Sequence, residues 1–205
     1  MIAPASRRQR RIGVLHASFA LLMATSATAN VSVELIAIAD AERTSIAMAT
    51  VSDDEATATL ASRRLLIPVE GVSARQLVDT YDDRRGEKSH EAIDIAAPRG
   101  TPVVAVDDGR IAKLFTSVPG GLTVYQLDPG QRFAYYYAHL DRYAEGLREG
   151  SAVRRGDVIG YVGSTGNAAP DAPHLHFAIF LMGPERQWWK GLPLNPYPFL
   201  ANTPR

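Results

Sequence analysis

The chain has 205 residues, of which 46% are apolar and 21% charged, and its 22 basic and 22 acidic residues give a formal net charge of zero. Four of the basic residues, within 7–11, precede every acidic residue, so the chain after residue 29 carries 18 basic and 22 acidic residues. This mildly acidic balance argues against an electrostatically driven nucleic-acid binder, and we expect no nucleic-acid partner. The absence of cysteine excludes a disulfide framework, a cysteine nucleophile and a cysteine-ligated metal.

The N-terminal region has the pattern of an export signal. An arginine-rich stretch is followed by the apolar run Ile12–Met23 and then by Ala27-Thr28-Ala29, a small-x-small cleavage pattern. The run is shorter than the ~20 residues that span a bilayer. We therefore predict a cleaved signal peptide over residues 1–29 and a periplasmic or cell-envelope location, with an uncleaved membrane anchor as the alternative.

The segment 30–64 is rich in Ala, Thr, Ser and acidic residues and lacks regular apolar spacing, which predicts a linker or pro-segment with a short helix around Asp40–Met48. From residue 65 onwards, short apolar runs alternate with Gly and Pro. This sequence pattern predicts one mainly β, antiparallel domain over residues 65–201. We expect strands at Ile93–Ala96, Pro102–Val106, Arg110–Thr116, Leu122–Leu127, Arg132–Leu140, Val158–Val162 and His174–Leu181.

The connections between these strands contain turn residues. Asp107-Asp108-Gly109 and Asp128-Pro129-Gly130-Gln131 each predict a hairpin between the strands on either side. Arg155-Gly156-Asp157 predicts a turn, and Tyr143–Glu149 is the one stretch of the domain that suits a helical turn.

Four histidines and one aspartate of this domain are candidate metal ligands. His90 and Asp94 are four residues apart, a spacing that suits one face of a strand or of a helix. His174 and His176 share one face of a strand, while Leu175 and Phe177 point to the opposite, buried face. Imidazole and carboxylate are ordinary zinc ligands, although each pair taken alone also suits plain surface or structural residues.

His139 ends the run Tyr135-Tyr-Tyr-Ala-His139. Strand parity places it on the face of Tyr135 and Tyr137, opposite Tyr136. A hydrolytic zinc site needs three protein ligands, one open position for water, and groups that move protons. The four histidines and Asp94 supply three ligands with two histidines left over, and the spacing alone does not say which two.

These residues resemble the lysostaphin/LytM-type (M23 family) zinc endopeptidases. The resemblance rests on His90-x-x-x-Asp94, Tyr137-Ala138-His139-Leu140 and His174-Leu175-His176-Phe177 in this order, and it covers about residues 65–198. The sequence also matches the family in the neighbouring segments Asp94–Val103, Gly156–Gly160 and Gly163–Asn167. Many relatives have Gly at the place of Ala92 and Glu at the place of Ala178, and neither position is a ligand.

The resemblance implies a mainly antiparallel β fold whose sheet forms a groove over a zinc ion. It implies that His90, Asp94 and His176 hold Zn²⁺ and that His139 and His174 are the catalytic histidines. The function implied is that of an exported endopeptidase that hydrolyses amide bonds in the peptide part of peptidoglycan through a zinc-activated water. The alternative is a catalytically inactive LytM-type regulator of other cell-wall hydrolases, and an exopeptidase acting on free peptides would share the same metal site.

Three further features have two interpretations each. Trp188 and Trp189 suit either a substrate groove or the packing of the C-terminal segment onto the sheet. Arg84 and Arg85 suit either a contact with a peptide carboxylate or a solvated loop. Asn167 suits either the border of the site or a turn.

Overall fold

The longest strand, β7 (Phe133–Tyr143), organises the domain. Its aromatic residues favour extended backbone, and Tyr135 and Tyr137 are fully buried in the core. One edge of β7 pairs with β6 (Gly121–Leu127). The other edge pairs first with β10 (His174–Met182), up to Ala138, and then with β9 (Val158–Val162), from Leu140 onwards. The change of partner therefore falls at His139.

The structure, a computed structural model, describes residues 54–201. All but the first two of these residues belong to one compact unit, Ala56–Arg205. Its remaining elements are η1 (Ala74–Gln76), β1 (Arg84–Arg85), β2 (Lys88–Ser89), β3 (Ile93–Ala96), β4 (Pro102–Val104), β5 (Gly109–Ser117), β8 (Ala152–Val153), β11 (Gly191–Leu194) and α2 (Tyr197–Ala201).

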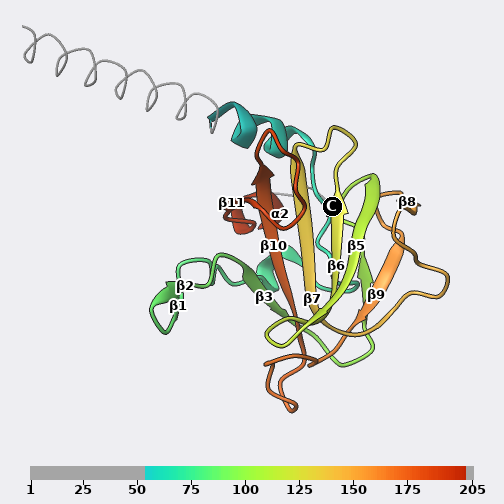
Figure 1. Ribbon diagram of the computed structural model, residues 1–205. Coiled ribbons are helices and arrows are strands. Elements are labelled where there is room, and N and C mark those ends of the chain that lie inside the picture. Colours follow the sequence, from blue (N-terminus) through green and yellow to red (C-terminus); the bar gives the residue numbers. More distant parts are fainter. Residues whose placement is uncertain (1–53, 202–205) are drawn as a thin grey trace, which may run out of the picture. The chain divides into compact units, whose positions relative to one another are not determined.

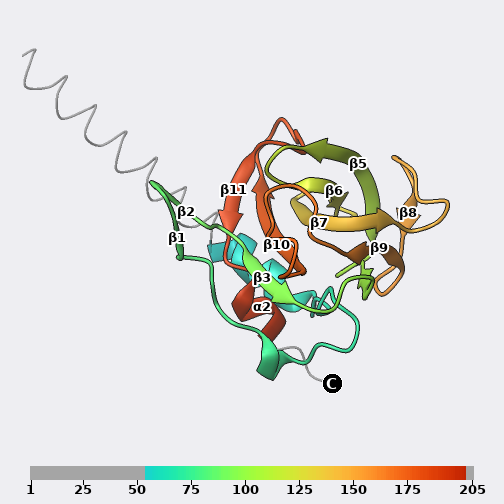
Figure 2. The same cartoon turned by 90° about the horizontal axis from the view of Figure 1, so that it is seen from below.

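One antiparallel sheet contains nine of these strands, in the order β11-β10-β7-β6-β5-β8, with β3 added beside β10 and β4 beside β9 (Figure 1). Seen from below, the strands curve around a common centre instead of lying in one plane (Figure 2). The expectation of a mainly β, antiparallel domain is confirmed. The small hairpin β1–β2 forms a separate two-stranded sheet.

Of the two predicted hairpins, one forms and one does not. The turn at residues 128–131 joins β6 and β7, which pair directly as Leu127 and Ala134. The hairpin at residues 107–109 is wrong, because β4 pairs with β9 whereas β5 pairs with β6 and β8. Asp107 is 8% exposed, and its carboxylate accepts from Tyr135 Oη at 3.1 Å and from Arg63 at 2.8 Å. These long-range contacts direct the chain from β4 into a different part of the sheet.

The helical turn predicted at Tyr143–Glu149 is also wrong. Strand β7 continues to Tyr143, and the chain then makes a single turn in which the Leu147 amide donates to the Ala144 carbonyl at 3.2 Å. Gly146 has a φ of +75, a left-handed conformation that ends any helical continuation.

A helix over residues 54–62 packs against the sheet from within the segment expected to be a linker. Ala56 and Leu60 are fully buried on its inner face. Directly after the helix, the Arg63 guanidinium donates to Asp107 at 2.8 Å and to Asp128 at 2.7 Å. The packed unit therefore begins before residue 65, the first residue of the domain in the sequence analysis.

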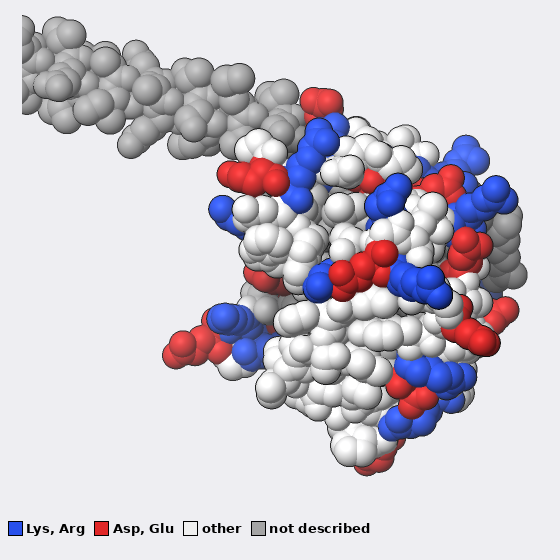
Figure 3. All heavy atoms as spheres, turned by 45° about the vertical axis from the view of Figure 1, so that its right-hand side comes forward, with Lys and Arg blue, Asp and Glu red and all other residues white. Residues whose placement is uncertain are grey.

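The predictions of a signal peptide at residues 1–29 and of a helix at Asp40–Met48 lie outside the described residues. Among the described residues, none forms a helix long and apolar enough to cross a bilayer. Figure 3 shows charges of both signs interspersed over one face, together with a broad uncharged area in its lower centre. This face carries no continuous basic stripe of the kind that follows a nucleic-acid backbone.

Candidate metal centre

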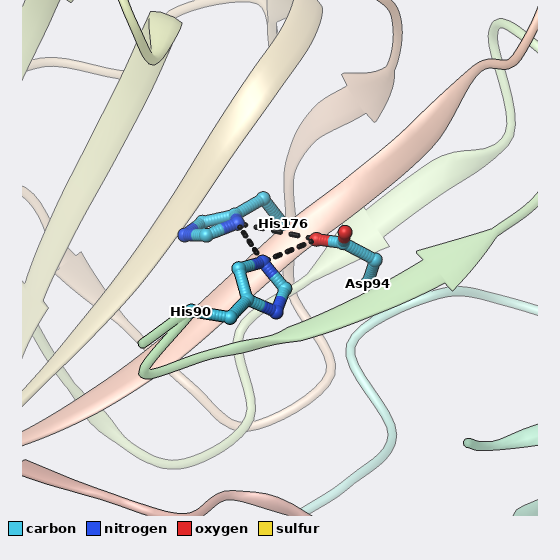
Figure 4. Close-up of side chains that lie close together, drawn as sticks. All are labelled: His90, Asp94 and His176. Carbon is cyan, nitrogen blue, oxygen red and sulfur yellow. Dashed lines mark hydrogen bonds and ion pairs between the residues drawn. The ribbon is translucent and has the colours of Figure 1, made fainter. Parts of the chain in front are cut away.

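Three side chains from distant parts of the sequence meet at one point. His90 Nε2 lies 3.0 Å from His176 Nδ1, and Asp94 Oδ1 lies 3.1 Å from each of these nitrogens. Figure 4 shows the two rings and the carboxylate pointing toward one another. Among the described residues, these three are the group of His and acidic side chains close enough to share a metal ion.

Two of the three residues are placed by strand pairing. Asp94 on β3 and His176 on β10 are direct cross-strand partners in an antiparallel pair, so their side chains leave the same face of the sheet side by side. Leu175 and Phe177 are fully buried on the opposite face, as the alternation on β10 predicts.

His90 is placed by a loop instead of a strand. It precedes β3, and the following residue, Glu91, has a φ of +57 that turns the chain. His90 Nδ1 lies 2.9 Å from the Thr80 carbonyl, and because a carbonyl only accepts, this nitrogen carries the proton. His90 Nε2 therefore presents a lone pair to the centre of the group.

Thr80 also supports the second ligand of the group. Its hydroxyl accepts from the Asp94 amide at 3.1 Å, so one residue orients both His90 and β3. Burial lowers the pKa of His90, and the adjacent Asp94 carboxylate opposes only part of this shift. Burial by itself raises the pKa of Asp94, but the hydrogen bond from His176 and the neighbouring imidazoles outweigh it and leave the pKa lowered.

The arrangement fits a zinc ion. Two imidazole nitrogens and one carboxylate oxygen are ligands that Zn²⁺ prefers, and tetrahedral bonds of ~2.0–2.2 Å place neighbouring ligand atoms roughly 3.3–3.5 Å apart. The three atoms already lie 3.0–3.1 Å from one another. A small outward movement of each side chain would therefore accommodate the ion.

The remaining two histidines flank this group without joining it. His139 Nδ1 donates to the Thr165 carbonyl at 2.8 Å, and His174 Nδ1 donates to the Ala172 carbonyl at 2.9 Å. Both rings therefore keep Nε2 unprotonated when neutral. The rings lie 4.9 Å apart, centroid to centroid, and His174 Nε2 is 3.9 Å from Asp94 Oδ1. Burial lowers the pKa of His139, and the hydrogen bond to the Thr165 carbonyl opposes part of the shift.

His139 reaches this site because β7 is irregular there. Strand parity predicts that His139 shares a face with Tyr135 and Tyr137, and this prediction is wrong. His139 has a φ of +59, and the pairing of β7 with β6 shifts register between Tyr137 and Leu140. The pairing with β9 shifts between Leu140 and Arg142. Such a bulge reverses the side-chain alternation, so His139 faces the cavity together with Tyr136.

The turn between β5 and β6 and the loop after β9 together hold His139 in this conformation. The His139 amide donates to the Gly120 carbonyl at 2.8 Å, while Thr165 donates its hydroxyl to the Leu140 carbonyl at 2.8 Å. A Cβ on Gly163 would clash with the Asp141 amide nitrogen, so this close approach of loop and strand requires glycine.

All five sequence-predicted residues line one cavity of about 650 Å³. Tyr136 and Lys88 are among the lining residues that sequence reasoning missed, and it gave a site role for Arg85 only as one of two interpretations. Arg85 Nη2 lies 2.8 Å from Asp94 Oδ2. Asn167 also borders the cavity.

The two tryptophans lie outside the lining of this cavity. Trp188 packs 4.7 Å from Tyr125 and 6.1 Å from Phe115, between ring centroids, so it pins the segment after β10 onto the sheet. Trp189 is 62% exposed. The packing interpretation therefore describes Trp188 and leaves Trp189 unexplained.

Residues 88–196 match the sequence profile of peptidase family M23, which covers more than half of the chain. The chain is similar to the L-Ala--D-Glu endopeptidase of Bacillus subtilis, with 33% identity over 129 residues that cover 59% of this chain and 38% of that protein. It is also similar to the DD-carboxypeptidase/endopeptidase Mpg of Neisseria meningitidis, with 38% identity over 116 residues that cover 56% of this chain and 24% of that protein. The chain thus spans well under half the length of these relatives.

The fold also has a counterpart among solved structures. The catalytic domain of lysostaphin from Staphylococcus simulans matches with a TM-score of 0.52 and 28% identity, over 62% of this chain and 92% of that chain. The match therefore covers nearly all of an isolated catalytic domain of this type.

Proposed function

The chain belongs to peptidase family M23, and from this membership we propose that it is an exported zinc endopeptidase that hydrolyses amide bonds in the peptide part of peptidoglycan. The observation that carries the proposal is the convergence of His90, Asp94 and His176 with ligand atoms 3.0–3.1 Å apart. The names of the relatives, which include an L-Ala--D-Glu endopeptidase, support a wall peptide as substrate.

His90, Asp94 and His176 would hold the metal, and a zinc ion at this place supplies Lewis acidity and lowers the pKa of a bound water toward neutrality. His139 and His174 would perform the proton transfers. Each has its Nδ1 proton committed to a backbone carbonyl, so each presents Nε2 as a base.

The two Nε2 atoms suit complementary tasks. One accepts the proton of the attacking water, because an imidazole has a pKa near the working pH. The other, when its Nε2 carries a proton taken up from solvent, donates a hydrogen bond to the oxygen that becomes negative in the tetrahedral intermediate. The imidazole that accepted the proton of the water can then pass it to the leaving amine as the C–N bond breaks, which completes hydrolysis of the amide bond.

Export follows from the substrate, because peptidoglycan lies outside the cytoplasmic membrane. The arginine-rich start, the apolar run Ile12–Met23 and Ala27-Thr28-Ala29 support a signal peptide over residues 1–29. We expect the protein recovered from the cell envelope to begin at Asn30. N-terminal sequencing of that protein tests this part of the proposal, and an intact residue 1 on all of it would contradict cleavage.

The decisive experiment is digestion of purified sacculi by the full-length protein, with and without a chelator, followed by mass spectrometry of the released fragments. We expect soluble muropeptides with newly formed peptide termini, their loss on chelation, and recovery when zinc is added back. A protein that retains stoichiometric zinc but releases no fragment would contradict the enzyme and favour the inactive regulator. Cleavage of free peptides alone would favour the exopeptidase.

A further inference from the structure

A row of aromatic side chains leads away from the metal centre over the outer face of the sheet. We call this row the aromatic strip; it comprises Tyr136, Tyr125, Trp188, Phe115 and Trp189. Tyr136 on β7 and Tyr125 on β6 are direct cross-strand partners with ring centroids 4.6 Å apart. Trp188 lies 4.7 Å from Tyr125, and Trp189 lies 5.1 Å from Trp188. Phe115 also lies beside Trp188, with ring centroids 6.1 Å apart, so every ring of the strip contacts at least one other.

The strip begins inside the cavity. Tyr136 lines the cavity wall, and its ring centroid lies 5.9 Å from that of His176. A polymer that passes the metal centre and continues over Tyr136 would therefore meet the remaining rings in succession. The strip is continuous with the candidate site.

Packing alone does not explain the outer end of the strip. Trp188 is partly buried against Tyr125 and Phe115, which suffices to hold its segment on the sheet. Trp189 is nevertheless 62% exposed and Phe115 is 43% exposed. Adjacent large apolar side chains that remain open to solvent are characteristic of a binding surface.

The charges around the strip favour a neutral ligand. None of its five residues is charged at neutral pH, and an ionised group placed on them would lose water without gaining a partner. Lys113, which is the cross-strand neighbour of Tyr125 on β5, is ion-paired with Glu149 at 2.8 Å. The strip therefore offers flat apolar faces without a net charge.

We propose that the aromatic strip binds the glycan strand of peptidoglycan, a chain of N-acetylated sugars, beside the cavity where the stem peptide is cut. Pyranose rings have an apolar C–H face that stacks on aromatic rings while their hydroxyl and amide edges remain in water. The stem peptide carries ionised carboxylates and suits the strip less well. This inference rests on the proposed function, because it takes the polymer that the enzyme would cut as the ligand.

The composition of the chain provides a direct probe, because its two tryptophans both lie in the strip. The full-length protein without metal is titrated with chitohexaose, a soluble N-acetylglucosamine oligomer, and separately with a free stem peptide. Tryptophan emission and the two indole N–H signals in NMR spectra report binding. We expect a saturable change with the sugar and none of comparable size with the peptide.

Two variants test the contribution of the rings. Trp189→Ala should weaken sugar binding about five- to tenfold, as expected for loss of one stacking contact; its remaining indole reports the titration. Phe115→Thr should weaken binding in the same direction without removing a tryptophan. Val78→Ala is the matched control, because Val78 is also 62% exposed but lies outside the strip and the cavity lining. Thermal unfolding confirms that each variant is folded.

The proposal is overturned if the sugar leaves both indole signals unchanged at millimolar concentration, if the stem peptide shifts them as strongly, or if all variants bind the sugar equally. Binding is read without metal and without hydrolysis. Sugar binding by a protein that does not cut sacculi would therefore contradict the proposed function alone, whereas cleavage by a protein that does not bind the sugar would contradict this inference alone.

Discussion

Arg85 forms an ion pair with only one of the two carboxylate oxygens of Asp94. Arg85 Nη2 lies 2.8 Å from Asp94 Oδ2, while Oδ1 of the same carboxylate faces His90 and His176. The guanidinium thus occupies one oxygen and leaves the other to the metal. A charged partner of this kind orients a ligand and favours its ionised form.

We expect Arg85→Ala to weaken zinc binding by about tenfold, at the lower end of the 10–100-fold range for groups that support a ligand, because the Arg85 side chain is partly in solvent. Competition with a chelator of known affinity measures the change. Arg84→Ala is the matched control, since Arg84 contacts the Gly86 carbonyl and, within residues 54–201, no carboxylate. Equal zinc affinity of the two variants would contradict the role of Arg85.

The proposed division between ligands and proton carriers predicts two different losses. His139→Ala and His174→Ala should each reduce the rate of sacculus digestion by about 10²–10⁴ while zinc remains bound, as expected for a lost general acid or base. His90→Ala should lose both zinc and activity. Digestion rates and zinc content of the purified variants are measured together. Full activity of either His139→Ala or His174→Ala would show that its role is assigned incorrectly.

The buried imidazoles predict a loss of stability in acid for the metal-free protein. Burial lowers the pKa of His90 and of His139 in the folded state below the unfolded value of about 6.5. Between the two values the unfolded chain binds more protons, so the free energy of unfolding decreases as the pH falls through about 6.5 toward the lowered pKa. Asp94, whose pKa is also lowered, contributes at lower pH, beneath the usual carboxylate range.

Urea unfolding of the metal-free protein between pH 7.5 and pH 5 measures this dependence. His139→Gln removes one of the two imidazoles and should flatten the slope of unfolding free energy against pH. An unchanged slope would mean that His139 does not resist protonation in the folded state.

The ion pairs of Arg63 predict that a stable domain must include this residue. Its guanidinium contacts Asp107 and Asp128, and the Asp128 side chain is fully buried. Arg63→Ala leaves both carboxylates without this partner and should lower the free energy of unfolding by roughly 2–3 kcal/mol, less than for a fully buried pair because Arg63 keeps 23% exposure. Arg75→Ala, at an exposed residue, is the control. Denaturant unfolding of the two variants provides the comparison, and equal stability would contradict the anchoring role of Arg63.

Much of the local structure follows from the sequence alone. Strand limits at Ile93–Ala96 and Val158–Val162 agree with the structure because apolar alternation and flanking Gly or Pro mark them within a few residues. The shared face of His174 and His176 follows from the period of two in a regular strand. The sequence pattern also identified five of the residues that line the cavity, through their resemblance to one family.

Tertiary structure decided the features that depend on partners far along the chain. His139 faces the cavity because β7 changes its partner from β10 to β9 at that residue, which parity within one strand cannot indicate. The failed hairpin at residues 107–109 and the role of Arg63 both depend on buried ion pairs over more than forty residues. Local sequence thus determines which segments extend and which side chains they offer, whereas strand pairing and buried charge determine which of those side chains meet.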